Sequence, residues 1–143
     1  EFMISPNPGE PLKPLRRTAS GGELSRIMLA MKAIAAEGGG VDSMVFDEID
    51  TGVSGRMAQT VAEKLHRIAA HRQVLCITHL PQIAAMGDAH FVVEKRVEDG
   101  RTGSYVRRLD DDGRVGEIAR LIGGSGETSI KHAQHLLASA HAQ

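Results

Sequence analysis

The chain has 143 residues, of which 41% are apolar and 24% are charged, a balance typical of one globular domain or part of one. Its 17 basic and 18 acidic side chains nearly cancel, which excludes the strongly basic surface of a dedicated nucleic-acid-binding module. No apolar run approaches the roughly 18 residues needed to cross a bilayer, and no basic-then-apolar leader opens the chain. We therefore expect a soluble, intracellular protein.

The first segment is rich in proline. Residues 1–4 are typical of a short strand, and residues 5–19 hold four of the five prolines together with a basic stretch at 13–17, which predicts a loop. Because Glu1 stands where an initiator methionine would be, and already within an expected strand, we expect the chain to begin in mid-protein.

An amphipathic helix is predicted after residue 19. Apolar residues recur there at intervals of three and four, and residues 38–40, all glycine, end the pattern. Ser20 is the expected N-cap, and Glu23 would complete a capping box, which is the purely structural interpretation. Gly21 and Gly22 add a second one, because bare backbone N–H groups at the positive end of a helix dipole can bind a phosphate.

A strand–helix–strand unit follows. Residues 44–46 form an apolar strand, residues 54–71 an amphipathic helix with Met57, Val61, Leu65 and Ile68 on one face, and residues 74–77 a second strand. The only cysteine, Cys76, lies in that second strand, where it is typical of a small buried hydrophobe. Short apolar strands alternating with helices predict an α/β fold, with a mainly parallel sheet covered on both faces.

Polar side chains follow both strands. Asp47 and Glu48 come directly after the first, and His79 follows the second. The carboxyl ends of parallel strands meet at one edge of a sheet, where ligands bind, and adjacent strand residues point to opposite sides. We therefore expect Asp47 to bind Mg²⁺, Glu48 to act as the general base of nucleotide hydrolysis, and His79 to contact a γ-phosphate.

The C-terminal third changes pattern. Residues 90–97 and 104–109 predict a hairpin around 98–101, an antiparallel edge to the sheet, and two helices are expected near 114–122 and 127–140. No segment matches the phosphate-binding loop G-x-x-x-x-G-K-[ST]. We therefore expect this chain alone not to hold ATP and to be inactive.

Three motifs in order carry a family resemblance. Residues 19–23, 44–48 and 77–79 resemble the signature motif, the Walker B strand and the switch histidine of SMC and ABC ATPases. Within that superfamily, the longer strings at 7–15, 47–55 and 78–84 are similar to the RecN family of bacterial DNA-repair proteins, and the likeness runs essentially from end to end.

This resemblance implies that residues 1–143 are the C-terminal lobe of an ATPase head, with the Walker A lobe and a long coiled coil outside the chain. It implies a homodimer of heads that encloses ATP and Mg²⁺, in which Ser20, Gly21, Gly22 and Glu23 serve the nucleotide bound to the opposite head. It also implies bacterial double-strand break repair and recombination at the nucleoid, in the cytoplasm and away from membranes. DNA would be contacted mostly through other regions.

Two departures from general ABC patterns matter. The aspartate usual seven residues beyond the Walker B aspartate is replaced by Ser54, which leaves the corresponding role open between Ser54 and Asp50. Ala19 and Glu23 replace the leucine and glutamine common in transporter signatures, which favours the SMC branch. The alternatives are the head of another SMC-like or ABC ATPase, and a non-catalytic interaction module that uses the helices near 114–140 as a docking surface.

Overall fold

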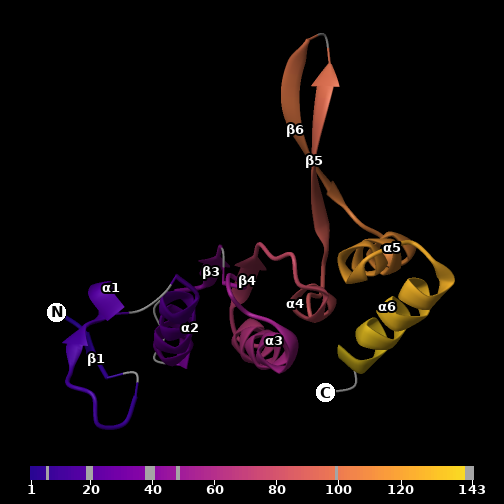
Figure 1. Cartoon of the computed structure of the whole chain (residues 1–143). Coiled ribbons are helices and arrows are strands. Elements are labelled where there is room, and N and C mark those ends of the chain that lie inside the picture. Colours follow the sequence, from indigo (N-terminus) through magenta and orange to yellow (C-terminus); the bar gives the residue numbers. More distant parts are fainter. Residues whose placement is uncertain (6, 19–20, 38–40, 48, 99, 141–143) are drawn as a thin grey trace. The chain divides into compact units, whose positions relative to one another are not determined.

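The computed structural model describes residues 1–5, 7–18, 21–37, 41–47, 49–98 and 100–140 (Figure 1). The chain divides into two compact units, Glu1–Thr78 and His79–Gln143, where the composition led us to expect one domain or part of one.

The first unit begins with a short antiparallel pair. β1 (Met3–Ile4) pairs with β2 (Lys13–Pro14), and α1 (Leu15–Thr18) follows at once. The predicted strand at 1–4 is confirmed in its second half. The prediction of an uninterrupted loop over 5–19 is wrong, because β2 and α1 lie within it. Proline cannot donate a ladder hydrogen bond, but Pro14 is tolerated at the end of a two-stranded pair.

The next helix is α2 (Gly21–Glu37), which begins directly after the expected N-cap position. Leu29 is buried, yet much of the apolar stripe that predicted this helix is 39–70% exposed. The residues concerned are Leu24, Met28, Met31 and Ile34. Helical periodicity identifies a face that needs covering, but it does not show that the cover belongs to this chain.

The centre of the first unit is a βαβ motif. β3 (Ser43–Phe46) and β4 (Gln73–Cys76) are parallel and joined by α3 (Gly55–Ala69), as predicted. Met44 and Phe46 are buried on one face of this pair. α3 buries Ala58, Val61, Ala62, Leu65 and Ile68. Met57, which we placed on the buried face, is 47% exposed, so the stripe is rotated towards the alanines.

The other face of the β3–β4 pair is open. Val45, Leu75 and Ile77 are 58%, 49% and 62% exposed. The expected covering on both faces is therefore absent within the described residues.

The second unit starts with α4 (Pro81–Ala85), which was not predicted. The predicted hairpin is confirmed as β5 (Phe91–Glu98) and β6 (Arg101–Arg108), a long antiparallel ribbon (Figure 1) whose pairing continues to Glu98 and Arg101. Gly100, at φ 74°, lies in the turn, a conformation that favours glycine.

Two helices complete the second unit. α5 (Asp111–Ile122) begins at Asp111 instead of near 114, because Asp110 caps it by accepting a hydrogen bond of 2.8 Å from the backbone N–H of Gly113. α6 (Glu127–Ala140) matches the prediction. The helices α4, α5 and α6 pack together, and the core of the unit includes Ile83, Ala85, Ile118, Ala119 and Ala133.

The fold is mixed α/β with small sheets. The strands of the described residues form three two-stranded sheets, of which β3–β4 alone is parallel, and the hairpin is a sheet of its own. A mainly parallel sheet with the hairpin as its edge is therefore not confirmed. Within the described residues, no helix is both long and apolar enough to span a membrane.

Candidate functional site

The carboxyl ends of β3 and β4 lie side by side. Phe46 is paired with Cys76, and the N–H of Ile77 donates to the carbonyl of Phe46 at 2.9 Å, so the ladder runs to the last residue of each strand. Asp47, the predicted Mg²⁺ ligand, comes directly after Phe46 and is exposed. The two strands therefore end together, as predicted, and present Asp47 at that edge of the pair.

A buried carboxylate lies in the turn that follows. Asp50 is 3% exposed and accepts a hydrogen bond of 2.7 Å from the hydroxyl of Thr78, two residues after β4. Its own carbonyl accepts from the N–H of Val53 at 3.0 Å, which closes the turn. Asp50 was a second-choice site residue, and its burial could not be read from the sequence.

The pKa of the Cys76 thiol is affected by the charges around this edge. Burial raises the pKa of its thiol to about 11, and the negative charges of Asp50 and then of Asp47 add to the effect. The thiol is partly buried, somewhat less than its apolar sequence context predicted. Both aspartates thus lie close enough to the end of β4 for their charges to be felt there.

Ser54, the other candidate for the missing aspartate, stands at the N-cap position of α3. It is exposed, its backbone is extended at φ −151° and ψ 163°, and its side chain makes no capping hydrogen bond. The next residue, Gly55, has φ 52°, where glycine is favoured. The hydroxyl of Ser54 is therefore not committed to its own helix.

The signature motif opens α2. Gly21 and Gly22 are the first two residues of the helix, and Glu23 lies in its first turn. Ser20 and Glu48, the expected N-cap and general base, lie outside the described residues, so the capping box and the general base stay predictions.

His79 is exposed and comes directly after Thr78, at the start of the second unit. Its predicted grouping with Asp47 at a common edge stays a prediction.

The donor set fits Mg²⁺ in one particular way. Within the described residues, no group of three or more histidine, cysteine or acidic side chains could hold a metal ion. Magnesium in nucleotide sites typically binds one or two carboxylates and takes its other ligands from phosphates and water. The exposed carboxylate of Asp47 suits that pattern, in which the protein supplies only part of the ligand set.

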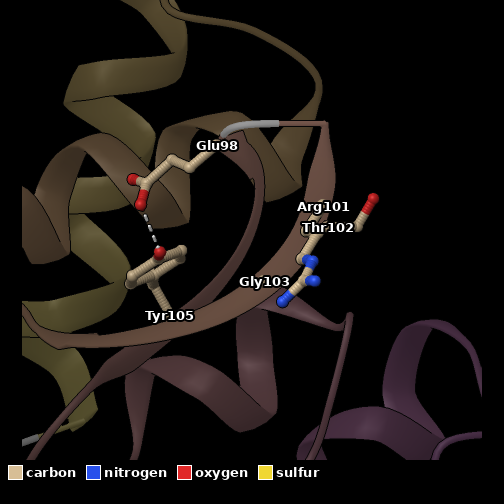
Figure 2. Close-up of a pocket in the computed structure, with 5 residues that line it drawn as sticks. All are labelled: Glu98, Arg101, Thr102, Gly103 and Tyr105. Carbon is tan, nitrogen blue, oxygen red and sulfur yellow. Dashed lines mark hydrogen bonds between the residues drawn. The ribbon is translucent and has the colours of Figure 1, made fainter.

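Sequence reasoning missed a hollow near the tip of the hairpin (Figure 2), lined by Glu98, Arg101, Thr102, Gly103 and Tyr105. The hydroxyl of Tyr105 donates to Glu98 at 2.7 Å, and the guanidinium of Arg96 lies 5.3 Å from the centre of the Tyr105 ring. The carboxylate of Glu94, on the same face of the ribbon, binds Arg96 at 2.7 Å and Arg107 at 3.4 Å.

These bonds lower the pKa of Glu94, that to Arg96 most strongly. The polar side chains of this face therefore form hydrogen bonds and ion pairs with one another along the ribbon. None of the predicted site residues lies among those that line the hollow.

No protein-family model matches the chain. Curated relatives do match it over almost its whole length. DNA repair protein RecN of Halalkalibacterium halodurans is 55% identical over 139 residues, 96% of this chain and 25% of the relative. RecN of Bacillus subtilis is 53% identical over 98% of this chain and 25% of the relative, and RecN of Deinococcus radiodurans is 54% identical over 96% and 24%.

The fold has a solved counterpart. A structure from work on the ATP-driven dimerization and DNA-stimulated activation of SMC ATPases superposes with a TM-score of 0.56 at 20% identity, covering 87% of this chain and 81% of that one. That likeness shows the fold alone. The sequence identity goes further: the chain belongs with the C-terminal part of the DNA repair protein RecN, and it spans about a quarter of the length of the curated relatives it matches.

Proposed function

We propose that this chain is the C-terminal lobe of an ATP-hydrolysing head that dimerises around ATP and Mg²⁺, and that hydrolysis is coupled to DNA binding in double-strand break repair and recombination. The observation that supports this most is the edge of the β3–β4 pair. There the exposed Asp47 directly follows β3, which is in register with the strand that leads to His79.

The exposed apolar surface of the first unit supports a partner lobe. Val45, Leu75 and Ile77 form an open sheet face, and α2 exposes its own apolar stripe. Exposed apolar residues gathered on a sheet face and along a helix are typical of a site of association. In the proposed protein, the N-terminal lobe with the Walker A loop covers part of this surface and supplies the phosphate-binding lysine that this sequence lacks.

Each site residue has one task in the proposed reaction. Asp47 helps to hold Mg²⁺, which when bound offsets the charge that develops on the phosphates. Glu48 takes a proton from the attacking water, and His79 donates to a γ-phosphate oxygen. Ser20, Gly21, Gly22 and Glu23 meet the nucleotide of the opposite head, so hydrolysis requires two heads. We expect the reaction in the bacterial cytoplasm, at the nucleoid.

Changing Glu48 to Gln tests the enzyme directly, in a protein that joins this segment to its Walker A lobe. General-base catalysis is worth about 10²- to 10⁴-fold, so we expect kcat for ATP to fall by at least about 100-fold while ATP affinity is retained. Glu127→Gln is the matched control, because Glu127 lies exposed on α6, where it pairs with Lys131 of the same helix. Equal turnover in the Glu48→Gln variant and the control would refute the assignment.

The alternatives are separated by the same preparation. RecN relatives at 42–55% identity favour the DNA-repair assignment over the head of another SMC-like or ABC ATPase. If the joined lobes bind ATP but never hydrolyse it, even with DNA present, the chain is a non-catalytic interaction module.

A further inference from the structure

We propose that Asp50 is a positioning residue: its buried carboxylate holds the hydroxyl of Thr78 and so fixes the segment that follows β4, in which His79 is the next residue. This inference rests on the proposed ATPase function and adds to it a residue whose role is not contact with the nucleotide.

The bond joins the two segments that follow the paired strands. Asp50 and Thr78 are 28 positions apart in sequence, and their side-chain oxygens lie 2.7 Å apart. Asp50 comes three residues after Asp47, and Thr78 comes one residue before His79. The bond therefore lies close in sequence to Asp47, which we place at Mg²⁺, and to His79, which we place at the γ-phosphate.

Backbone hydrogen bonds restrain both segments that the bond between Asp50 and Thr78 joins. The N–H of Ile77 donates to Phe46 at 2.9 Å, and the N–H of Val53 donates to Asp50 at 3.0 Å. Ile49 and Val53, in the same turn, are 2% and 6% exposed. A hydrogen bond to a carboxylate is stronger than one between neutral groups, and burial shields it from water, so it restrains both segments.

Burial also decides what Asp50 does not do. At 3% exposure its carboxylate is turned away from solvent, and a group that must meet the nucleotide of a second head has to be accessible. Of the two candidates for the missing aspartate, the exposed Ser54 is then the one that is open to such a contact.

The decisive variants are Thr78→Val and Thr78→Ser. Valine keeps the shape of threonine but lacks the donor, whereas serine keeps the donor. Thr60→Val is the matched control, because the exposed hydroxyl of Thr60 donates to the carbonyl of Arg56 within α3, at 3.3 Å, away from the ends of β3 and β4. Asp50→Asn complements them by removing the charge while keeping an acceptor oxygen.

In the protein that joins this segment to its Walker A lobe, we expect Thr78→Val to lower kcat by about 10- to 100-fold with KM within about twofold. Misplacement of a catalytic group by about 1 Å has effects of that size. Thr78→Ser should restore most of the loss. A role in stability alone would lower the melting temperature without this selective fall in kcat, and a Thr78→Val variant that hydrolyses ATP like the Thr60→Val control overturns the proposal.

The 143-residue chain alone gives a readout that does not depend on ATP hydrolysis. We expect Thr78→Val to shift the NMR signals of the His79 ring and to speed amide exchange at 77–80, while Thr78→Ser and Thr60→Val leave both near the wild type. Wild-type joined lobes that fail to hydrolyse ATP would refute the proposed function. The NMR comparison would still decide whether the hydrogen bond between Asp50 and Thr78 positions His79. His79 signals and exchange rates that coincide in Thr78→Val and wild type overturn it.

Discussion

Ile118 should be the most sensitive single position in the second unit. It is fully buried on α5, in the packed group of α4, α5 and α6. Changing it to Ala removes three carbon groups, worth about 2.4 kcal/mol at about 0.8 kcal/mol each. The cavity left behind raises the expected loss to about 3–4 kcal/mol, inside the usual range for such changes.

Native-state hydrogen exchange measures this loss locally. Because a tenfold change in an opening equilibrium corresponds to about 1.4 kcal/mol, the slowest amides of α5 and α6 should exchange at least about 100-fold faster in Ile118→Ala. Ile34→Ala is the matched control: the same atoms are removed from a side chain that is 70% exposed on α2. Surface changes of this kind stay within about 0.5 kcal/mol.

Equal exchange of the α5 and α6 amides in Ile118→Ala and Ile34→Ala would refute the packing described for this unit. So would acceleration confined to residues outside 81–140.

Two further predictions concern the same unit. Burial, followed by the positive charge of Arg114, lowers the pKa of His90, against a hydrogen bond with the backbone of Ala84 and the charge of Glu117. As the pH falls, His90 therefore binds a proton in the unfolded chain before it does so in the folded one. The unit should keep its stability above about pH 6.5 and lose it as the pH drops below that value. Urea unfolding at pH 7.5 and 5.5 tests this; an equal loss in a His90→Gln variant would assign the effect elsewhere. Asp110→Ala removes the cap of α5 and should cost about 1 kcal/mol, with a smaller loss for Asp110→Asn, and an unchanged urea midpoint in the Ala variant would contradict the capping role.

Periodicity predicted most of the elements because apolar repeats are local. The helices α2, α3 and α6, the strands β3 and β4 and the hairpin all lie close to where the sequence placed them. The misses have local reasons as well. α4 is five residues long, too short to show a repeat, and α5 starts early because Asp110 supplies a cap ahead of its first apolar residue.

Burial was harder to predict than secondary structure. The stripe of α2 and the outer face of β3–β4 have the pattern of a core, but they stay exposed because their cover is not formed by the described residues. The site was predicted from strand ends, which is why Asp47 was placed at the edge where β3 and β4 end. The hydrogen bond between Asp50 and Thr78 was not predicted, since the two residues are far apart in the sequence and no local spacing encodes such a pair.

The raised pKa of Cys76 makes the chain convenient to label. With its pKa raised by burial to about 11, the Cys76 thiol is ionised far less at pH 7.5 than an ordinary cysteine. Because it is the only cysteine in the chain, a second thiol introduced on an exposed helix would react with a maleimide dye long before Cys76 does. Fluorescent labels could therefore be attached to this 143-residue chain without first replacing its native cysteine.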